Sequence, residues 1–403
     1  MKKSILHHLL VAMIGSTFAV IATACGSKST TSGTFSEENS LLTYANHLQL
    51  YEEDDATLCI ITDINHPDKR LASYLLLPKG TDNYPSSWKN IEECIVIRTP
   101  LDRIALTSTC HAYLLQAIGG ERHISVLCDA QYTQNKTIKQ LCKEGHISDG
   151  GASHSPNWEQ IYAASIDAFW TTDASPQVRH RLSVQNIPLI MSMDYLESSP
   201  LGRAEWMRFY GRLCGKGNTA DSLFAEVEKQ YKALCHSLDA ERTQASGEEP
   251  TQKGNRPRIW PRLLADSPYG GTWFVAGGNS YISKIYQDAG AEYIWSNDHH
   301  VGSIALSPEA VLAQASDCDL WILKRYAPEG MSLQQFFKEN HLYSQFKAAV
   351  HGNIYWCNSA INAYYDETPF HPDWLLEDIH TIVHHIALQQ ELLPTLRYFQ
   401  RLE

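Results

Sequence analysis

One amphipathic segment near the middle of the chain constrains the fold most strongly. Apolar residues recur there at helical spacing, at Ala220, Leu223, Phe224, Val227, Tyr231, Leu234 and Leu238. This spacing puts all of them on one face of an α-helix. Asn218 is placed to cap the helix, and Asp221 lies in its first turn, where a negative charge suits the helix dipole. About 20 residues at 1.5 Å each make a rod of roughly 30 Å, enough to connect two lobes.

Short apolar runs alternate with helical patterns on both sides of that helix. Before it, the patterns predict strands at Ile104–Leu106, Ile124–Leu127, Ile166–Trp170 and Pro188–Met191, with helices at Cys110–Ile118 and Gln177–Val184. After it, they predict strands at Arg258–Trp260, Trp273–Val275, Asp319–Leu323 and Ile354–Trp356, with helices at Ser280–Ala289, Pro308–Gln314, Leu333–Lys338 and Asp373–Gln390. Such alternation predicts largely parallel sheets covered on both faces. We therefore expect an α/β protein with two Rossmann-like lobes joined by a single long helix.

Four further strands are predicted ahead of the first lobe pattern, at His47–Tyr51, Thr57–Ile61, Ala72–Leu77 and Cys94–Ile97. The boundaries follow from these patterns. We expect an N-terminal lobe over residues 41–200, an interlobe helical segment over 201–240 and a C-terminal lobe over 258–403. Residues 241–257 contain almost nothing apolar and are predicted to form a loop.

The first 24 residues resemble a secretory signal. Lys2 and Lys3 give a positive start, an uncharged and mostly apolar stretch runs from Leu9 to Ala22, and small residues precede Cys25. This is similar to a bacterial lipobox, so we expect lipid on Cys25 and a polar tether over residues 25–40. Ordinary signal-peptidase cleavage, with Cys25 incidental, is the alternative. The prediction is an exported protein, lipid-anchored at the periplasmic face of a membrane.

The other nine cysteines are an odd number and contain no CxxC pair. They occur at positions 59, 94, 110, 128, 142, 214, 235, 318 and 357. Most of them interrupt apolar runs, where a free cysteine acts as a small buried hydrophobe. One or two disulfides remain an open alternative in an exported protein. A zinc site built from cysteines is not expected without paired spacing.

Charge and motifs exclude several classes of function. The chain has 33 Lys and Arg against 45 Asp and Glu, a formal charge of −12 that becomes −14 once Lys2 and Lys3 are removed. So acidic a chain lacks the clustered cations that nucleic-acid phosphates require. The enzyme motifs GxSxG, HExxH and GxGxxG are absent, and Gly211–Gly217 is too short between its glycines for a P-loop. We therefore expect binding without catalysis, with a surface lipoprotein hydrolase as a weaker alternative.

Four stretches in a fixed order carry a family resemblance. They are Arg103–His111 with Leu114–Gly120, Ser199–Trp206, Trp273–Tyr281 with Asp288–Ala291, and Pro372–Ile379. The chain resembles the substrate-binding lipoproteins of ABC importers for vitamin B12 and iron chelates, in the form common in Bacteroidetes. The resemblance covers most of residues 95–385. It implies the class III periplasmic-binding-protein fold, whose two lobes close only slightly around a ligand.

The resemblance also implies a function. The protein would capture a metal chelate in an interlobe cleft and deliver it to an ABC permease and its ATPase. Ferric siderophore and cobalamin are about equal candidates, and haem is behind them. A monomer without a resident cofactor is expected. The family's N-lobe docking glutamate has no equivalent near Cys110–Tyr113, and Glu309 suits a helix start on its own account, so docking residues stay unassigned.

Aromatic residues make up 10% of the chain and supply most of the candidate ligand contacts. Flat chelates need large apolar walls with a few fixed polar groups. The candidates in the C-terminal lobe are Tyr269, Trp273, Gly278, Asn279, Ser280 and Tyr281. Gly278 would let the backbone approach a ligand, and Asn279 and Ser280 offer hydrogen bonds at a helix start. Packing in the lobe core is the alternative for the aromatic members.

Three more candidates belong to the N-terminal half. His111 and Tyr132 follow predicted strands, at the sheet edge where doubly wound folds bind ligands. Arg203 would meet an anionic chelate, or have a structural role with Glu205. The metal alternative rests on His380 and His384, which are four residues apart and so lie on one face of a helix. His385 directly follows His384. That spacing suits free Zn²⁺ or Mn²⁺, although no third ligand is evident nearby.

Overall fold

A computed structural model describes residues 39–81, 85–88, 91, 93–246, 260–390, 392 and 394–403. The predicted signal segment, Cys25 and most of the predicted tether lie outside these residues. The described residues belong to one compact unit, Phe35–Glu403. Across the described residues, no helix combines the length and the apolar character that crossing a bilayer requires.

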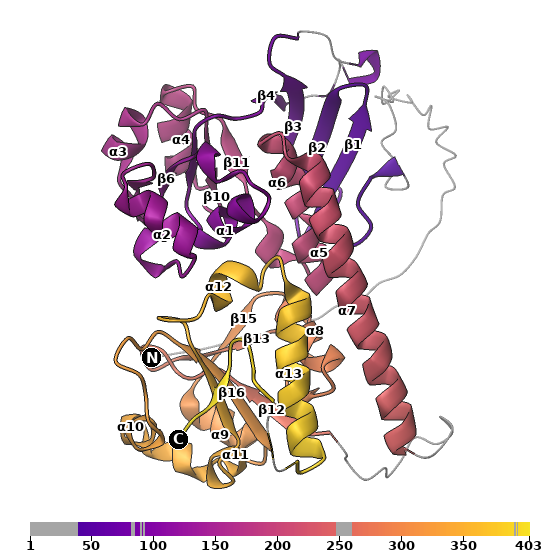
Figure 1. The fold of residues 1–403 in the computed structure, drawn as a ribbon, viewed down its shortest axis with the longest axis vertical. Helices are drawn as coiled ribbons and strands as arrows, with labels where there is room; N and C mark the ends of the chain where they lie inside the picture. Colours follow the sequence, from indigo (N-terminus) through magenta and orange to yellow (C-terminus); the bar gives the residue numbers. More distant parts are fainter. Residues whose placement is uncertain are drawn as a thin grey trace, which may run out of the picture. The chain divides into compact units, whose positions relative to one another are not determined.

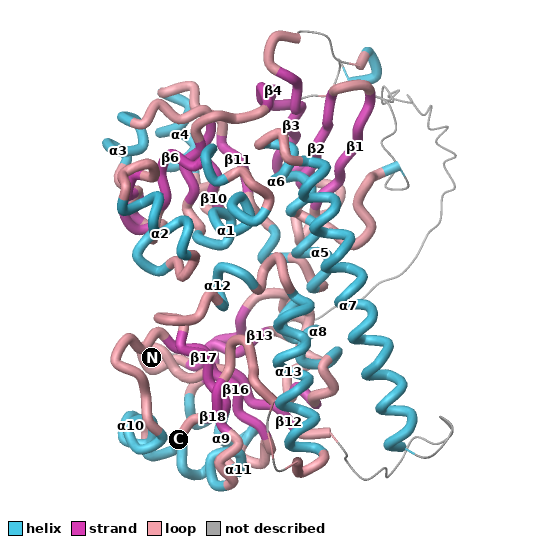
Figure 2. The backbone as a smooth tube through the Cα atoms, viewed as in Figure 1, coloured by secondary structure: helices cyan, strands magenta, loops and turns pink. Residues whose placement is uncertain are grey.

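A four-stranded sheet opens the described chain. It is built from β1 (Leu48–Glu53), β2 (Ala56–Thr62), β3 (Arg70–Pro78) and β4 (Cys94–Thr99), in that order across the sheet. The first three strands pair antiparallel, and β4 runs parallel to β3. All seven residues of β2 are buried because both faces of the sheet are covered by apolar side chains. All four strands predicted in this region are confirmed (Figure 2).

The N-terminal lobe contains a parallel sheet in the order β11-β10-β5-β6-β7. Its strands are β5 (Ile104–Leu106), β6 (Ile124–Leu127), β7 (Ser148–Asp149), β10 (Ala168–Thr171) and β11 (Leu189–Met191). The helices α1 (Thr109–Ala117), α2 (Lys136–Lys143), α3 (Trp158–Ala163) and α4 (Pro176–Val184) alternate with them, and the short strands β8 (Gly151–Ala152) and β9 (Ser155–Pro156) form a small hairpin. The predicted alternation of strand and helix is therefore confirmed here.

The connecting segment contains α5 (Pro200–Glu205), α6 (Met207–Leu213) and the long helix α7 (Gly217–Ser246). Helix α7 packs on α6 and on α13 (Pro372–Ala387) of the C-terminal lobe. It therefore contacts both halves of the chain (Figure 1). The helix continues six residues beyond position 240, into the range where the sequence predicted a loop. Residues 247–257 lie outside the described part of the chain.

The C-terminal lobe contains a second sheet in the order β14-β12-β16-β17-β18. Its strands are β12 (Arg262–Ala265), β14 (Glu292–Tyr293), β16 (Leu320–Arg325), β17 (Ile354–Asn358) and β18 (Gln400–Arg401), and only β18 runs antiparallel to its neighbour. A separate antiparallel pair is formed by β13 (Trp273–Ala276) and β15 (Ser303–Leu306). The remaining helices are α8 (Tyr281–Asp288), α9 (Pro308–Ala315), α10 (Leu333–Glu339), α11 (Lys347–Val350) and α12 (Tyr364–Glu367).

One predicted strand of this lobe was placed too early. Trp260 lies in a bend, and the strand begins only at Arg262, after Pro261. The proline has no backbone N–H to donate to a sheet, which explains why pairing starts behind it. Arg258 and Ile259 lie outside the described residues.

The string Ser199–Trp206 is explained by packing around α5. A side chain on Gly202 would place its Cβ 2.7 Å from the carbonyl oxygen of Tyr44, so only glycine fits there. Glu205 is fully buried and accepts hydrogen bonds of 2.7–3.0 Å from the backbone N–H groups of residues 43–45. A buried carboxylate is stable when such donors satisfy it. This string therefore fastens the start of the described chain to the connecting segment.

Candidate functional site

A pocket of about 480 Å³ lies between the two lobes. It is lined by Thr107, Ser108, Thr109, Asp129, Tyr132, Ser153 and Thr172 of the N-terminal lobe and by Tyr326, Ser359, Asn362, Tyr365 and Asp366 of the C-terminal lobe. Nine of these twelve side chains carry a hydroxyl group. We call this feature the interlobe pocket.

The topology of the two sheets brings these residues together. Thr107 directly follows β5, Thr172 follows β10, Tyr326 follows β16 and Ser359 follows β17. In open α/β sheets the carboxyl ends of parallel strands meet at one edge, and ligands bind there. Each lobe therefore contributes the binding edge of its own sheet to the interlobe pocket.

Ser108 stands at the N-cap position of α1, yet its side chain makes no capping bond. Its Oγ instead lies 3.0 Å from Sγ of Cys110. By contrast, the N-cap serines of α8 and α9, Ser280 and Ser307, accept the capping hydrogen bond in the usual way. The hydroxyl of Ser108 is therefore available to a ligand near the positive end of the α1 dipole.

Two tyrosines, one from each lobe, contact each other in the lining of the interlobe pocket. Tyr132, after β6, and Tyr326, after β16, pack edge to face with ring centroids 5.4 Å apart. Both remain about half exposed. Aromatic rings in this arrangement give a flat ligand an apolar wall and keep a polar tip for hydrogen bonding. Among the predicted contacts, Tyr132 is the one that lines the pocket.

A carboxylate of the C-terminal lobe is bonded to the N-terminal lobe beside this pocket. Oδ2 of Asp366, in α12, accepts a bond of 2.9 Å from Oγ1 of Thr133 and a bond of 2.6 Å from the backbone N–H of Gln134. Asp366 is 3% exposed and Thr133 is fully buried. These two bonds connect the lobes at one edge of the pocket.

A second buried polar group, which we call the Asp194 cluster, connects the N-terminal lobe to the connecting segment and, through Arg203, to α8 of the C-terminal lobe. One oxygen of Asp194 lies 3.1 Å from Nε2 of His111 and accepts a 2.9 Å bond from the hydroxyl of Tyr210. The other accepts a 3.2 Å bond from Nε of Arg203, whose guanidinium lies 4.4 Å from the ring centroid of Tyr281 in α8. Such a cation–π contact adds to the attraction between α5 and α8.

The electrostatics of this cluster are balanced internally. Burial alone would raise the pKa of Asp194, but its hydrogen bonds with His111 and Tyr210 and the charge of Arg203 hold it well below the ordinary value. Burial would lower the pKa of Arg203, but Tyr281 and Asp194 raise it above its usual range. Both groups therefore stay charged and paired, as a buried ion pair requires. The suggested pairing of Arg203 with Glu205 is not what forms.

Three predicted contact residues therefore lie in the Asp194 cluster: His111, Arg203 and Tyr281. The structure places His111 2% exposed, with its ring packed against Trp170 and Tyr210. It does not line the interlobe pocket, because it lies two residues further into α1 than Thr109, the last of the hydroxyl residues there that do. The sequence rule located the right sheet edge and selected a residue just behind it.

The remaining candidates of the C-terminal lobe are placed outside the pocket lining. Trp273 is fully buried, donates from Nε1 to the carbonyl oxygen of Ala265 at 3.0 Å and stacks on Trp321. It is a core residue, which was the alternative interpretation of this aromatic group. Tyr269 is 83% exposed, on a turn before β13.

The turn before α8 is shaped by contacts within the lobe. A Cβ on Gly278 would collide with carbonyl oxygens of the loop at residues 295–298. The glycine therefore allows its backbone to pack against that loop. Asn279 donates from its side chain to the carbonyl oxygen of His299 at 3.1 Å, and Ser280 caps α8 by accepting the N–H of Ser283 at 3.2 Å. These bonds give each polar side chain a structural partner.

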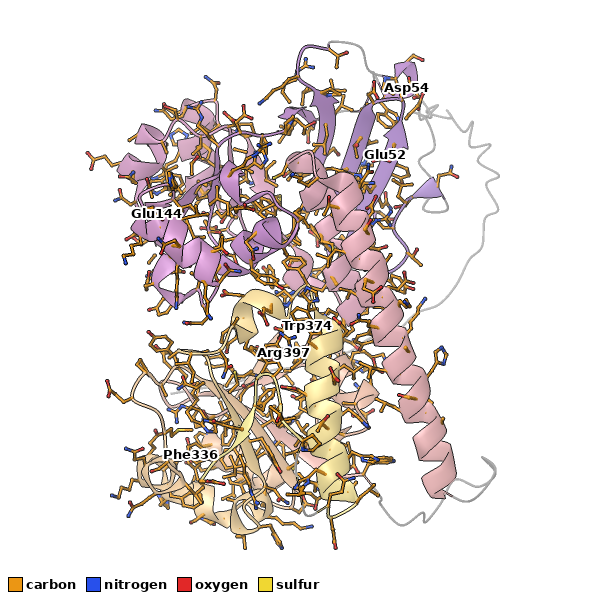
Figure 3. The ribbon with its side chains drawn as sticks, viewed as in Figure 1. Glu52, Asp54, Glu144, Phe336, Trp374 and Arg397 are labelled. Atoms are coloured by element: carbon orange, nitrogen blue, oxygen red, sulfur yellow. The ribbon has the colours of Figure 1, made fainter. Side chains whose placement is uncertain are left out.

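A layered stack lies at the start of α13. The ring of His371 stacks on Trp374 with centroids 3.6 Å apart, and the guanidinium of Arg397 covers Trp374 at 3.8 Å. Figure 3 labels Trp374 and Arg397 at this position. His371 also contacts the ring of Tyr113 in α1 at 6.0 Å, so this stack adds an aromatic contact between the lobes.

Among the described residues, the cysteines and histidines show no metal-binding arrangement. All nine described cysteines are free thiols, six of them buried, and no disulfide joins them. Burial raises the pKa of Cys110, Cys128 and Cys214 to about 12, which keeps these thiols neutral. Within the described ranges, no three His, Cys, Asp or Glu side chains are grouped to hold a metal ion. His380 and His384 do lie on one helix face, with ring centroids 5.2 Å apart.

Most of the pocket was missed by the sequence analysis. The pocket could have been found from the residues that directly follow the strands β5, β10 and β17, since each of them carries a hydroxyl group. Asp366 carries no such signal, since it lies in a four-residue helix eight positions after β17.

The fold is shared with solved binding proteins. A periplasmic haem-binding protein from Pseudomonas aeruginosa matches with a TM-score of 0.56 and 14% identity over 75% of this chain and 98% of that one. The molybdate-binding protein MolA of Haemophilus influenzae matches with a TM-score of 0.55 and 14% identity over 74% and 90%. An Fe³⁺-hydroxamate ABC transport protein from Saccharomonospora viridis matches with a TM-score of 0.52 and 16% identity over 70% and 93%. The predicted class III fold is confirmed.

Sequence comparison gives the same assignment. An uncharacterized lipoprotein of Methanocaldococcus jannaschii is 24% identical over 381 residues, covering 89% of this chain and 85% of the relative. The model of the family described as "Periplasmic binding protein" matches residues 104–360, from β5 to just beyond β17. That match spans well over half of the chain, which therefore belongs to the periplasmic binding protein family.

Proposed function

We propose that this protein is the solute-binding component of an ABC importer and that its ligand is a metal chelate. It would hold the chelate between its lobes and present it to the permease and its ATPase. Family membership supports the binding role, and three structural neighbours are described as handling haem, ferric hydroxamate and molybdate. An exported chain anchored by lipid on Cys25 is part of this proposal, and the related lipoprotein of Methanocaldococcus jannaschii supports it.

The observation that carries the proposal is the interlobe pocket itself. Its volume of about 480 Å³ falls in the range of small-molecule sites, roughly 300–1,000 Å³. Tyr132, Tyr326 and Tyr365 supply flat apolar surface, and the hydroxyl groups supply donors and acceptors around it. A chelate with an apolar body and a polar periphery matches both kinds of wall.

The lining separates the candidate chelates by charge. Among the described residues that line the pocket, none is Lys, Arg or His. The two propionates of haem would therefore meet no counter-charge and would face Asp129 and Asp366. Neutral or cationic ferric siderophores and cobalamin carry amide and hydroxamate groups that suit the hydroxyl lining. We therefore favour these two classes over haem.

A spectroscopic titration of the purified protein tests the proposal. Ferric siderophores, cobalamin, haem, Zn²⁺ and Mn²⁺ would be added in turn while tryptophan fluorescence and ligand absorbance are followed. We expect one chelate class to bind with micromolar or tighter affinity. Tyr132→Ala and Tyr326→Ala are expected to weaken that binding at least tenfold, because each removes one pocket wall.

His380→Ala is the matched control, since it removes a ring of similar size outside the pocket and should leave chelate affinity within twofold. The proposal is wrong if every chelate fails to bind, Zn²⁺ binds tightly to the wild type, and this Zn²⁺ binding is lost in the His380→Ala/His384→Ala variant. That result would instead support the free-metal alternative.

The anchor is tested separately. Cys25→Ser should abolish incorporation of labelled fatty acid and release the protein from membranes, without altering chelate affinity. Membrane association that survives this substitution would contradict the lipid anchor and leave the binding proposal standing.

A further inference from the structure

The charge of the interlobe pocket is one-sided. Asp129 and Asp366 are its two acids, one from each lobe, and the other ten lining residues are uncharged. Two buried cations of the structure are already committed elsewhere. Arg203 bonds to Asp194, and Nζ of Lys324 lies 2.7 Å from Asp266. Within the described residues, the pocket lining therefore contains negative charge without a positive partner.

Each of the two acids is held by neutral donors. Oδ2 of Asp129 accepts the backbone N–H of Ser153 at 3.2 Å. Oδ2 of Asp366 accepts the hydroxyl of Thr133 and the N–H of Gln134. Neutral hydrogen bonds orient a buried carboxylate but offset its loss of hydration less completely than a cation does. A positive group in the pocket would therefore be favoured electrostatically by both lobes at once.

Asp366 differs from Asp129 because its two bonds cross to the opposite lobe, whereas the bond of Asp129 to Ser153 stays within the N-terminal lobe. Both bonds to the N-terminal lobe end on Oδ2. The described residues form no hydrogen bond to Oδ1 of the same carboxylate, and Asp366 lines the pocket. Oδ1 can therefore accept a bond from a ligand. One side chain can thus contact the ligand and hold the opposite lobe at the same time.

We propose that the interlobe pocket selects chelates that carry positive charge, and that Asp366 links recognition of this charge to closure of the lobes. The inference rests on the proposed function and narrows its ligand class. A cation at Oδ1 holds the carboxylate in the orientation in which Oδ2 accepts the bonds from Thr133 and Gln134. A neutral chelate of the same shape gains only the hydroxyl and aromatic contacts.

Two pairs of probes separate charge from shape. Ferrioxamine B carries a protonated amine, whereas ferrioxamine E is a macrocycle of the same hydroxamate class without it. Aquacobalamin is a cation, whereas cyanocobalamin is neutral. Fluorescence titration of the purified full chain gives an affinity for each probe, and stopped-flow displacement gives its dissociation rate. We expect the cationic member of the pair that binds to bind at least tenfold more tightly.

Three variants locate the preference. Asp366→Asn keeps the size of the side chain and should reduce the charge preference to less than threefold. Thr133→Val is nearly isosteric and lies outside the pocket lining, so it should raise the dissociation rate of both members severalfold while keeping the preference. Asp129→Asn should lower the preference in part, because it removes the other negative charge of the pocket lining.

The outcomes separate this inference from the proposed function. Chelates that bind without a charge preference, or a preference that survives Asp366→Asn, would overturn the inference and leave the proposed function standing. A dissociation rate unaffected by Thr133→Val would overturn the link to closure. Failure of every chelate to bind would overturn both the inference and the proposed function.

Discussion

Two buried carboxylates near the junction of the lobes are hydrogen-bonded in different ways. Asp194 is surrounded by a guanidinium, an imidazole and a phenol. Asp366 is bonded to one hydroxyl and one backbone N–H, both neutral. The charge of Asp194 is therefore balanced inside the protein, whereas the charge of Asp366 is left for something that enters the pocket. We therefore expect the Asp194 cluster to stabilise the fold with or without a ligand, and the contact at Asp366 to respond to a ligand.

The largest expected effect comes from breaking the balanced cluster. Asp194→Ala would leave Arg203 buried without its carboxylate and would remove the acceptor of Tyr210. Removing one partner of a buried ion pair costs about 3–5 kcal/mol, and we expect a loss of that size in the free energy of unfolding, measured with urea. The double variant Asp194→Ala/Arg203→Met should recover part of the loss, because it removes both charges. A loss below about 1 kcal/mol would show that the cluster is not balanced in this way.

Acid should remove the stabilisation that this cluster provides. The pKa of Asp194 is lower in the folded protein than the value of about 3.9 for an unfolded aspartate. Its stabilisation is therefore complete above that value and is lost as the pH falls through it toward the folded pKa. We expect the free energy of unfolding to fall more steeply below about pH 4 in the wild type than in Asp194→Ala. Equal slopes in urea titrations would contradict this.

Local patterns in the sequence predicted the fold well. The strands β5 and β6 have the bounds predicted for them, because each is a short, mostly apolar run that begins directly after a polar residue. The end of α7 was predicted too early because the apolar stripe stops at Leu238, whereas the helix continues to Ser246. Ala, Glu, Arg and Gln beyond that point are good helix formers that need no core contact.

The site was harder to predict because its contacts are long-range. Thr133 and Asp366 are 233 residues apart in the sequence, and no local pattern pairs them. Trp273 illustrates the other difficulty. Its strand buries Trp273 and Val275 on one face and turns Phe274 outward, but a run of apolar residues does not show which face meets the core. Composition therefore indicated an aromatic site without distinguishing wall from core.

Two serines at helix N-cap positions show the same contrast as the two carboxylates, with smaller expected effects. Ser307 makes its capping bond to the N–H of Ala310 at 3.1 Å, whereas Ser108 makes none. Ser307→Ala should therefore cost about 1 kcal/mol of stability and leave chelate affinity unchanged. Ser108→Ala should leave stability within about 0.5 kcal/mol and weaken chelate binding about three- to tenfold, the range of one neutral hydrogen bond. Urea unfolding and fluorescence titration on both variants test this, and a loss of stability in Ser108→Ala would contradict it.

The smallest expected effect distinguishes aromatic composition from pocket geometry. Tyr269 was among the contacts suggested by the aromatic clustering, but its side chain is 83% exposed on a turn and does not line the interlobe pocket. Tyr269→Ala should therefore change chelate affinity by less than twofold, whereas Tyr132→Ala, which removes a similar ring from the pocket wall, should weaken it at least tenfold. A tenfold loss in Tyr269→Ala, measured by the same titration, would mean that this turn folds over a bound ligand. The ligand would then be recognised by an exposed loop as well as by the sheet edges that form the pocket.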